Sequence, residues 1–284
     1  MPPGADIVQL AHLVHAEPSR PEPATERTRY RTIWISDVHL GTRGCNAELL
    51  IDFLDHTDSD TLYLVGDIID GWQLRKRFHW PAAHNDVVWR LLKRAKRGAR
   101  VIYIPGNHDE VFRQFAGLHF GGVVIRRKAI HETADGRRLL VLHGDEFDAI
   151  MLAHRWLAHV GDAAYTALMG LSRHVSAVRR RFGMPYWSLS QHAKARVKNA
   201  VAFISHFEQV VAHAAGSRGV DGVVCGHIHT AEMREIDGIR YYNDGDWVEG
   251  CTALVEHADG RMEILRWADV VAARARAAAL RLAA

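Results

Sequence analysis

The sequence has few cysteines, few prolines beyond residue 29, no long apolar run and little net charge. Its three cysteines, Cys45, Cys225 and Cys251, are far apart and form no CxxC pair, which argues against a disulfide framework and against a zinc ribbon. No apolar run approaches the ~20 residues that span a bilayer. The apolar stretch 7–14 is too short and too interrupted for a signal peptide. We therefore expect a cytoplasmic protein.

The formal charge of +3 is small for 284 residues, so the composition indicates no nucleic-acid partner. Histidine is abundant, with 19 residues. The length suits one large domain, or one domain with an insertion. Five of the eight prolines lie in residues 1–29, which we expect to form a flexible N-terminal extension. The composition gives no indication of the oligomeric state.

Apolar strands alternate with helical segments in the first half of the chain, a pattern typical of a layered α/β fold. Strands are predicted at 32–39, 61–65, 100–105, 123–133 and 138–142, and helices at 49–54 and 87–95. Asp135-Gly136 predicts a hairpin turn between the last two strands. Residues of about 147–217 have helical periodicity and are interpreted as a helical insertion, or cap. Strands then resume at 222–225, 240–246, 252–256 and 262–267, and 268–284 predicts an Ala/Arg-rich helix.

Five of the predicted strands end in groups of polar residues: Asp37-x-His39, Gly66-Asp67-x-x-Asp70, Gly106-Asn107-His108-Asp109, His143 and Gly226-His227-x-His229. Each group alone could be an ordinary turn. Ligands of open α/β sheets, however, bind beyond the carboxyl ends of the strands. Carboxylate, imidazole and amide oxygen without thiolate suit manganese, iron or zinc. If seven of these residues are ligands, they are too many for one four-coordinate ion. They suit two ions that share a carboxylate and hold a phosphoryl group between them.

In this order, the five groups resemble the motifs of the calcineurin-like metallophosphoesterases. The resemblance covers residues of about 32–267 and implies a four-layer α/β/β/α sandwich, so that we take 30–267 as the phosphoesterase domain. It implies two divalent metal ions, with manganese favoured and iron or zinc as alternatives. Carried over by motif, one ion is held by Asp37, His39, Asp67 and His229, and the other by Asp67, Asn107, His143 and His227. It also implies that His108, beside Asn107, faces the substrate and that Asp70 orients His108.

Two further segments, 143–148 and 243–248, and the helical insertion resemble the UDP-2,3-diacylglucosamine diphosphatase group. Those enzymes cleave the pyrophosphate of a lipid A precursor at the cytoplasmic membrane face and release UMP and a lipid phosphate. The best-known branch of the group has Arg at the position of His108. The resemblance is therefore to a sister branch, and it implies a nucleotide-linked lipid diphosphate as substrate.

The predicted cap contains cations that could meet such a substrate. Lys194, Arg196 and Lys198 are candidates to bind the diphosphate, although helical spacing alone does not aim them inward. Arg179-Arg180-Arg181 precedes an apolar, aromatic stretch at 182–187, which fits either contact with a membrane surface or a solvated helix face. The Ala/Arg-rich helix at 268–284 leaves the same two interpretations open, so peripheral binding to the inner face of the cytoplasmic membrane stays an alternative.

Three other functions are weighed against the lipid diphosphatase. A phosphodiesterase or phosphatase with a soluble substrate is favoured by His108 and disfavoured by the long insertion. A nuclease is disfavoured by the modest charge. A scaffold that keeps the fold without the chemistry should lack ligands, whereas this sequence retains all seven and His108.

Overall fold

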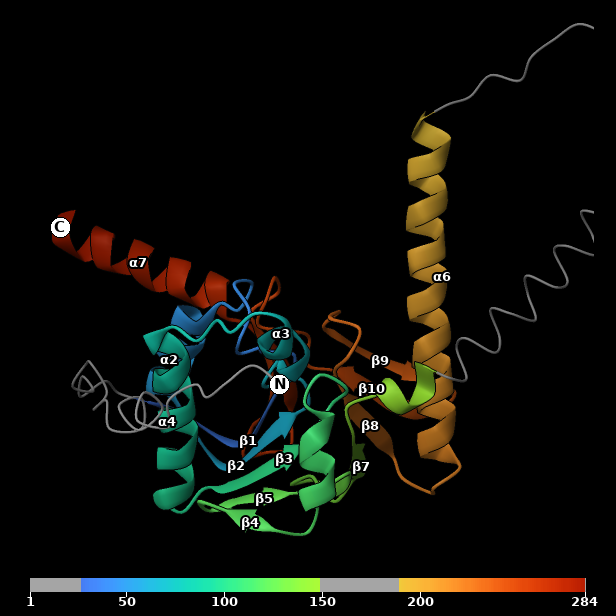
Figure 1. The fold of residues 1–284 in the computed structure, drawn as a ribbon, viewed down its shortest axis with the longest axis horizontal. Helices are drawn as coiled ribbons and strands as arrows, with labels where there is room; N and C mark the ends of the chain where they lie inside the picture. Colours follow the sequence, from blue (N-terminus) through green and yellow to red (C-terminus); the bar gives the residue numbers. More distant parts are fainter. Residues whose placement is uncertain (1–26, 149–188, 284) are drawn as a thin grey trace, which may run out of the picture.

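The computed structural model describes residues 27–148 and 189–283; for 189–201 and 282–283 it describes the backbone alone. Most of the predicted extension and much of the predicted cap, including Arg179-Arg180-Arg181, lie outside the described residues. The described residues form two β-sheets with helices on their outer faces (Figure 1). Among them, no helix is both long enough and apolar enough to cross a membrane.

The larger sheet has seven strands, of which four neighbouring strands run parallel. In spatial order the strands are β12 (Met262–Arg266), β11 (Thr252–Glu256), β1 (Thr28–Ile35), β2 (Thr57–Val65), β3 (Arg100–Ile104), β5 (Val123–Ile125) and β4 (His119–Phe120). The parallel set is β1, β2, β3 and β5, and their carboxyl ends therefore lie at one edge.

The smaller sheet has five strands, with a parallel centre and antiparallel edges. Its spatial order is β6 (Ala129–Glu132), β7 (Arg138–Val141), β8 (Gly222–Cys225), β10 (Ile239–Asn243) and β9 (Glu232–Ile236). A hairpin joins β6 to β7, and its turn contains Asp135 and Gly136, as predicted.

Three separate hydrophobic clusters show that the molecule has four layers. The first packs α2 (Ala47–His56) and α4 (Ala82–Lys96) on the larger sheet. The second lies between the two sheets, and the third packs α6 (Leu189–Gly216) on the smaller sheet. The four-layer α/β/β/α fold is therefore confirmed.

Strand β1 shows how the sequence produces these layers. Ile33 and Ile35 pack toward the helices, whereas Trp34 packs between the sheets against Tyr63. A strand buried on both faces needs a continuous apolar run, and that is the pattern of these residues. The remaining helices are short or terminal: α3 (Gly71–Lys76), η1 (Glu110–Phe115), η2 (Asp145–Phe147) and α7 (Trp267–Ala283).

The prediction of one strand over residues 123–133 is wrong. Residues 126–128 separate β5, which pairs with β3, from β6, which pairs with β7 in the other sheet. The chain thus crosses between the sheets at Arg126-Arg127-Lys128, where apolar side chains are missing. The apolar alternation continues on both sides of this crossing, so periodicity alone did not reveal it. The elements α3, β4 and β9 were not predicted, and β1 begins at Thr28 rather than Thr32.

Candidate metal centre

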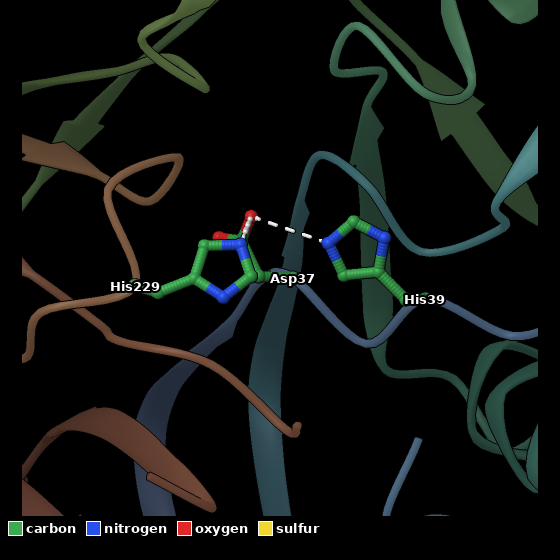
Figure 2. Close-up of side chains that lie close together, drawn as sticks. All are labelled: Asp37, His39 and His229. Carbon is green, nitrogen blue, oxygen red and sulfur yellow. Dashed lines mark ion pairs between the residues drawn. The ribbon is translucent and has the colours of Figure 1, made fainter. Parts of the chain in front are cut away.

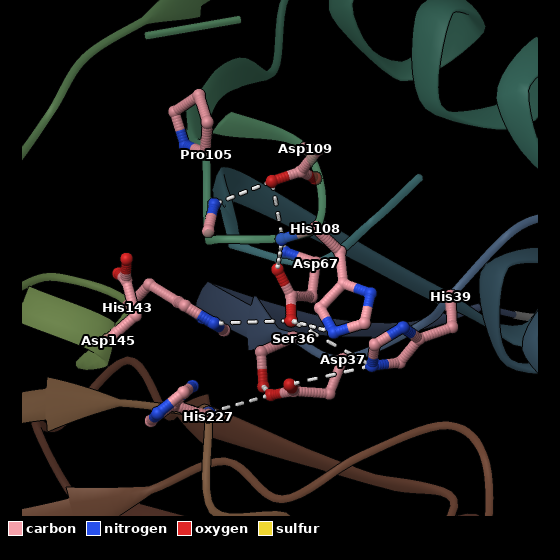
Figure 3. A network of polar contacts seen from close by, with 12 residues as sticks. Ser36, Asp37, His39, Asp67, Pro105, His108, Asp109, His143, Asp145 and His227 are labelled. Carbon is pink, nitrogen blue, oxygen red and sulfur yellow. Dashed lines mark hydrogen bonds and ion pairs between the residues drawn. The ribbon is translucent and has the colours of Figure 1, made fainter. Parts of the chain in front are cut away.

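The five polar groups follow the carboxyl ends of β1, β2 and β3 in the larger sheet and of β7 and β8 in the smaller one. Figure 3 shows that side chains from both sheets converge at this edge. Three overlapping groups of ligand atoms lie close enough to hold an ion: Asp37, His39 and His229; His39, Asp67 and His108; and Asp37, Asp67 and His143. Asp37, His39 and Asp67 each belong to two of these groups, so they lie at the middle of the cluster.

The first group joins loops from both sheets (Figure 2). Asp37 Oδ1 lies 3.2 Å from His229 Nε2 and 3.9 Å from His39 Nε2. Asp37 is fully buried, whereas the side chain of His229 is 39% exposed. One side of the cluster is therefore open to solvent through His229.

Asp67 connects the groups. Its Oδ2 lies 3.5 Å from His143 Nε2 and 3.9 Å from the Nε2 atoms of both His39 and His108. Its Oδ1 accepts a hydrogen bond from the backbone N–H of His108 at 2.9 Å. His143 in turn donates from Nδ1 to the carbonyl of Val65 at 2.8 Å, which leaves Nε2 facing the cluster.

Four buried polar atoms of the predicted metal ligands have no hydrogen-bond partner among the described residues: Asp37 Oδ1, His39 Nε2, Asn107 Oδ1 and His143 Nε2. Buried polar atoms are nearly always paired, because desolvation without a partner costs about 1–3 kcal/mol each. All four belong to predicted ligand residues and are of the oxygen and nitrogen types that divalent ions take. The residues present therefore fit divalent metal ions.

The backbone at this edge takes the left-handed conformation at several predicted ligands. Positive φ angles of 49–70° occur at five predicted ligands: Asp37, His39, Asp67, His227 and His229. Such left-handed conformations are uncommon for residues other than glycine and cluster at functional sites. The strain turns these side chains toward one point.

Glycines make room for the cluster at its tightest contacts. A Cβ on Gly106 would lie 2.2 Å from Asp67 Oδ1, and one on Gly66 would lie 2.2 Å from His143 Nδ1. Both distances are far shorter than any van der Waals contact, so no other residue fits at these positions without displacing a ligand.

His108 is held beside the ligands by two neighbours. Its Nδ1 lies 3.0 Å from Asp70 Oδ2, and the exposed ring of Trp72 covers it at a centroid distance of 4.3 Å. The same Asp70 oxygen pairs with His39 Nδ1 at 3.1 Å, and the other accepts from the N–H of Gln73. Asp70 thus contacts a predicted ligand as well as His108, a second contact that sequence analysis missed. His108 Nε2 also lies close enough to Asp67 and His39 to join an ion site.

His227 is oriented differently from the other predicted ligands. Its backbone N–H donates to Asp37 Oδ2 at 2.9 Å, but its Nε2 pairs with Asp148 Oδ1 at 2.8 Å. Its ring lies 5.1 Å from that of His143. Nδ1 is therefore the nitrogen of His227 that is left for an ion. Lys194, Arg196 and Lys198 lie on α6, and their side chains are outside the described part of the structure.

A buried hydrogen-bond chain that the motifs do not predict lies behind Asp37. Ser36 Oγ lies 2.6 Å from Asp37 Oδ2 and 2.7 Å from Asp244 Oδ1. The serine has one proton for two carboxyl groups. Burial raises the pKa of Asp244 well above its ordinary value, so Asp244 can remain protonated and donate to Ser36, which donates to Asp37. A serine before the D-x-H motif carries no signal by itself.

Asp109, the last residue of its motif, is a buried clamp for two loops. It accepts hydrogen bonds from Gly106 N at 2.6 Å, Ile68 N at 2.8 Å and the hydroxyl of Tyr103 at 2.5 Å. It thereby ties the loop after β3 to the loop that carries Asp67. Only its place in the motif could have pointed to this role.

The carboxylates and histidines of the cluster shift one another's pKa values. Burial opposes ionisation of Asp67, but His143 at 3.5 Å and the backbone N–H of His108 hold the pKa of Asp67 well below its ordinary range. Burial alone would lower the pKa of His143, yet Asp67 and Asp37 raise it to about 10. The carboxylates therefore favour a positive charge in their midst, which either a proton or a metal ion can supply.

Several known proteins are similar to this chain in sequence or in fold. The sequence model described as "Calcineurin-like phosphoesterase" matches residues 30–231. A UDP-2,3-diacylglucosamine hydrolase of Xanthomonas campestris is 27% identical over 81% of this chain and 96% of its own. One from Nitrosococcus oceani is 26% identical over 78% of this chain and 90% of its own. Among solved structures, an archaeal phosphodiesterase aligns with a TM-score of 0.40 and 12% identity over 82% of this chain and 98% of its own.

The family match spans most of the chain and contains all five motifs whose side chains meet at the strand ends. The enzymatic names of the curated relatives agree with a hydrolase, as predicted from the motifs. This chain therefore belongs to the calcineurin-like phosphoesterase family.

Proposed function

We propose that this protein is a two-metal phosphohydrolase that cleaves the diphosphate of a nucleotide-linked lipid and releases UMP and a lipid phosphate. The observation that carries the metal chemistry is the set of four buried, unpartnered ligand atoms at one edge of the sheets. The substrate class is supported by the names of the related UDP-2,3-diacylglucosamine hydrolases and by the resemblance of segments 143–148 and 243–248.

The proposed ligands divide into two sets that share Asp67. Asp37, His39, Asp67 and His229 would hold one ion, and Asp67, Asn107, His143 and His227 the other. When bound, two divalent ions would lower the pKa of water and stabilise the charge of the phosphoryl group. Manganese is favoured, and iron and zinc suit the same oxygen and nitrogen ligands.

His108 is proposed to act on the phosphoryl group or on the leaving oxygen. Its Nε2 faces the cluster, while Nδ1 lies against Asp70 and the ring lies against Trp72. A protonated imidazole in this position can stabilise developing negative charge or give a proton to the departing oxygen. Asp70 acts as a positioning residue, because a carboxylate on one ring nitrogen fixes which nitrogen carries the proton.

The direct test uses purified protein with manganese and a UDP-2,3-diacylglucosamine. We expect release of UMP, loss of activity after chelation, and recovery when manganese is returned. Elemental analysis should find about two ions per chain after reconstitution. If the protein hydrolyses no phosphate ester or anhydride with any divalent metal, the proposal fails.

A second candidate is a phosphodiesterase or phosphatase with a soluble substrate. It is favoured by His108, which stands where the best-known lipid enzymes have Arg. A comparison of kcat/KM for a small chromogenic phosphodiester and for the lipid nucleotide separates the two. A large preference for the small diester would favour the second candidate.

A further inference from the structure

A cleft of about 570 Å³ opens beside the metal centre, on the side of His39 and His229. Its volume is within the range of about 300–1,000 Å³ that is usual for small-molecule sites. Besides these two histidines, it is lined by Arg43, Gln73, Arg77 and His79, among others. Neither the motifs nor the predicted cap includes the two arginines.

The arginines come from different elements. Arg43 lies in the loop after the Asp37-x-His39 motif, and Arg77 directly follows α3. Both are exposed, and neither has an ion-pair partner within 27–148 and 189–283. Among the described residues, Asp70 is the only carboxylate that lines the cleft, and its oxygens contact His39, His108 and Gln73. Among the described residues, neither guanidinium group of this cleft is therefore held by a carboxylate.

The pocket on the opposite side of the centre, beside His143, is different. It is smaller, at about 280 Å³, and it is lined by Arg113, Arg127 and Lys128. Asp145 pairs with Arg113 through both oxygens, at 2.7 and 2.8 Å, and Glu146 pairs with Lys128 at 2.8 Å. Two of its three cations are thus held in ion pairs, so within the described chain this pocket offers one unpaired cation, Arg127, whereas the cleft on the other side offers two, Arg43 and Arg77.

We propose that Arg43 and Arg77 form a subsite for the non-reacting phosphate of a diphosphate substrate. This inference rests on the proposed function and specifies which side of the metal centre holds the anionic remainder of the substrate. When one phosphoryl group of the substrate lies at the ligand cluster, the adjacent phosphate of the same substrate would lie in the cleft that starts at His39 and His229.

The chemistry suits arginine. A guanidinium group offers several N–H donors in one plane and can bind two phosphate oxygens at once. Free arginines next to a site that handles phosphate also raise the local concentration of an anionic substrate. A substrate with a single phosphoryl group leaves this subsite empty, so the two arginines should discriminate between diphosphates and monophosphates.

The test is a binding measurement with two uridine nucleotides on the manganese-loaded, full-length protein. α,β-Methylene-UDP carries a diphosphate that cannot be cleaved, and UMP carries one phosphate. The variants are Arg43→Gln, Arg77→Gln and the double variant. Arg75→Gln is the matched control, because Arg75 is also exposed on α3 but does not line the cleft.

We expect the Kd of α,β-methylene-UDP to rise about tenfold for each lost arginine, with a much smaller change for UMP. Arg75→Gln should leave both values within about twofold of the wild type. With the lipid nucleotide, the same variants should raise KM more than they lower kcat. Circular dichroism of each variant checks that the fold is retained.

Two results would overturn the inference: equal losses of affinity for both nucleotides, or no loss for the diphosphate analogue in the double variant. A wild-type protein that binds UMP as tightly as the analogue would also overturn it. Failure of the proposed function looks different, because the wild type would then cleave neither the lipid nucleotide nor a chromogenic phosphodiester, whatever the binding data show.

Discussion

Two buried clusters of carboxylate and histidine lie in this molecule, and they are built in opposite ways. At the strand ends, Asp37 and Asp67 face histidines at 3.2–3.9 Å, and four polar atoms of the proposed ligands have no hydrogen-bond partner in the described chain. The second cluster surrounds Glu256, the last residue of β11, where Thr32 of β1 is its strand partner.

At Glu256 every oxygen is engaged. Arg31 donates to both oxygens, at 2.7 and 2.8 Å, and Thr32, His131 and the N–H of Ala134 complete the set. These residues come from β1, β6, β11 and the hairpin turn, so the cluster ties the two sheets together. Backbone strain also separates the clusters: positive φ angles occur at five predicted ligands and at none of these residues.

The difference shows what burial of a charge means in each place. When every oxygen of a buried carboxylate has a protein partner, removal of the carboxylate charge destabilises the fold. When the ligand atoms around a carboxylate lack partners, they leave coordination positions that the chain itself does not fill. The first cluster should therefore control activity more than stability, and the second should control stability more than activity.

The largest effect is expected for Asp67→Asn. The amide oxygen can still accept from the N–H of His108, but the charge that both proposed ion sites share is lost. We expect kcat/KM to fall on the order of 1,000-fold or more. Metal content should fall below one ion per chain. The melting temperature of the metal-free protein should fall less than that of Glu256→Gln, because the variant loses the charge that faces His143 but keeps the hydrogen bond from the N–H of His108. A loss of metal-free stability as large as that of Glu256→Gln would contradict the comparison.

Glu256→Gln should produce the opposite result. Loss of one partner from a buried ion pair costs about 3 kcal/mol, because Arg31 and His131 lose the charge that they face. We expect a lower melting temperature and a lower urea midpoint, with kcat/KM per folded molecule within about twofold of the wild type. A Glu256→Gln variant of normal stability, or one that is stable but inactive, would contradict the view that this cluster controls stability more than activity.

Lowering the pH should remove the stabilisation that the ionised Glu256 gives to the fold. Burial opposes ionisation, but hydrogen bonds from His131, Ala134, Arg31 and Thr32 lower the pKa of Glu256 from 4.5 to about 2. Because the folded-state pKa is depressed, this contribution is complete above the unfolded pKa and is lost as the pH falls from about 4.5 toward 2. The free energy of unfolding, measured with urea on the metal-free protein, should fall less steeply over this pH range for Glu256→Gln than for the wild type.

The sequence predicted the first cluster and not the second, for a physical reason. Ligands of an ion follow strand ends at short, fixed spacings, so Asp37-x-His39 and Gly226-His227-x-His229 are visible as motifs. Glu256 and its partners are single residues on separate strands, and only the pairing of β1 with β11 and of β6 with β7 brings them together. The hydrogen bonds of Ser36 with Asp37 and Asp244 were not predicted for the same reason.

The fold was predictable to a similar extent. Runs of apolar residues located most strands and the long helices, because burial on both faces leaves a clear pattern. The crossing at residues 126–128 was missed because a strand that leaves one sheet and enters another keeps its alternation. Strand β9 was missed because most of its side chains are not buried, so its pattern is weak.

His108→Ala should separate catalysis from metal binding. If His108 acts on the phosphoryl group or the leaving oxygen, its loss lowers kcat about 100-fold while about two ions per chain remain. His119→Ala is the control, since His119 is an exposed histidine of β4 that belongs to no ligand group. Loss of an ion in His108→Ala would instead make His108 a ligand, which its distance to Asp67 and His39 permits. Full activity would contradict the proposed role.

The smallest effect is expected for Ser36→Ala, which removes the hydroxyl between Asp37 and Asp244. Partners of metal ligands typically contribute 10–100-fold in affinity or activity, and this one acts on a single ligand, so we expect metal affinity to fall about tenfold. Ser59→Ala is a matched control, because Ser59 is an equally buried serine of β2 whose hydroxyl has no partner among the described residues. Titration of the metal-free variants with manganese gives the comparison. Equal effects at both serines would mean that the hydroxyl of Ser36 contributes only packing, and that the support for Asp37 comes from the backbone alone.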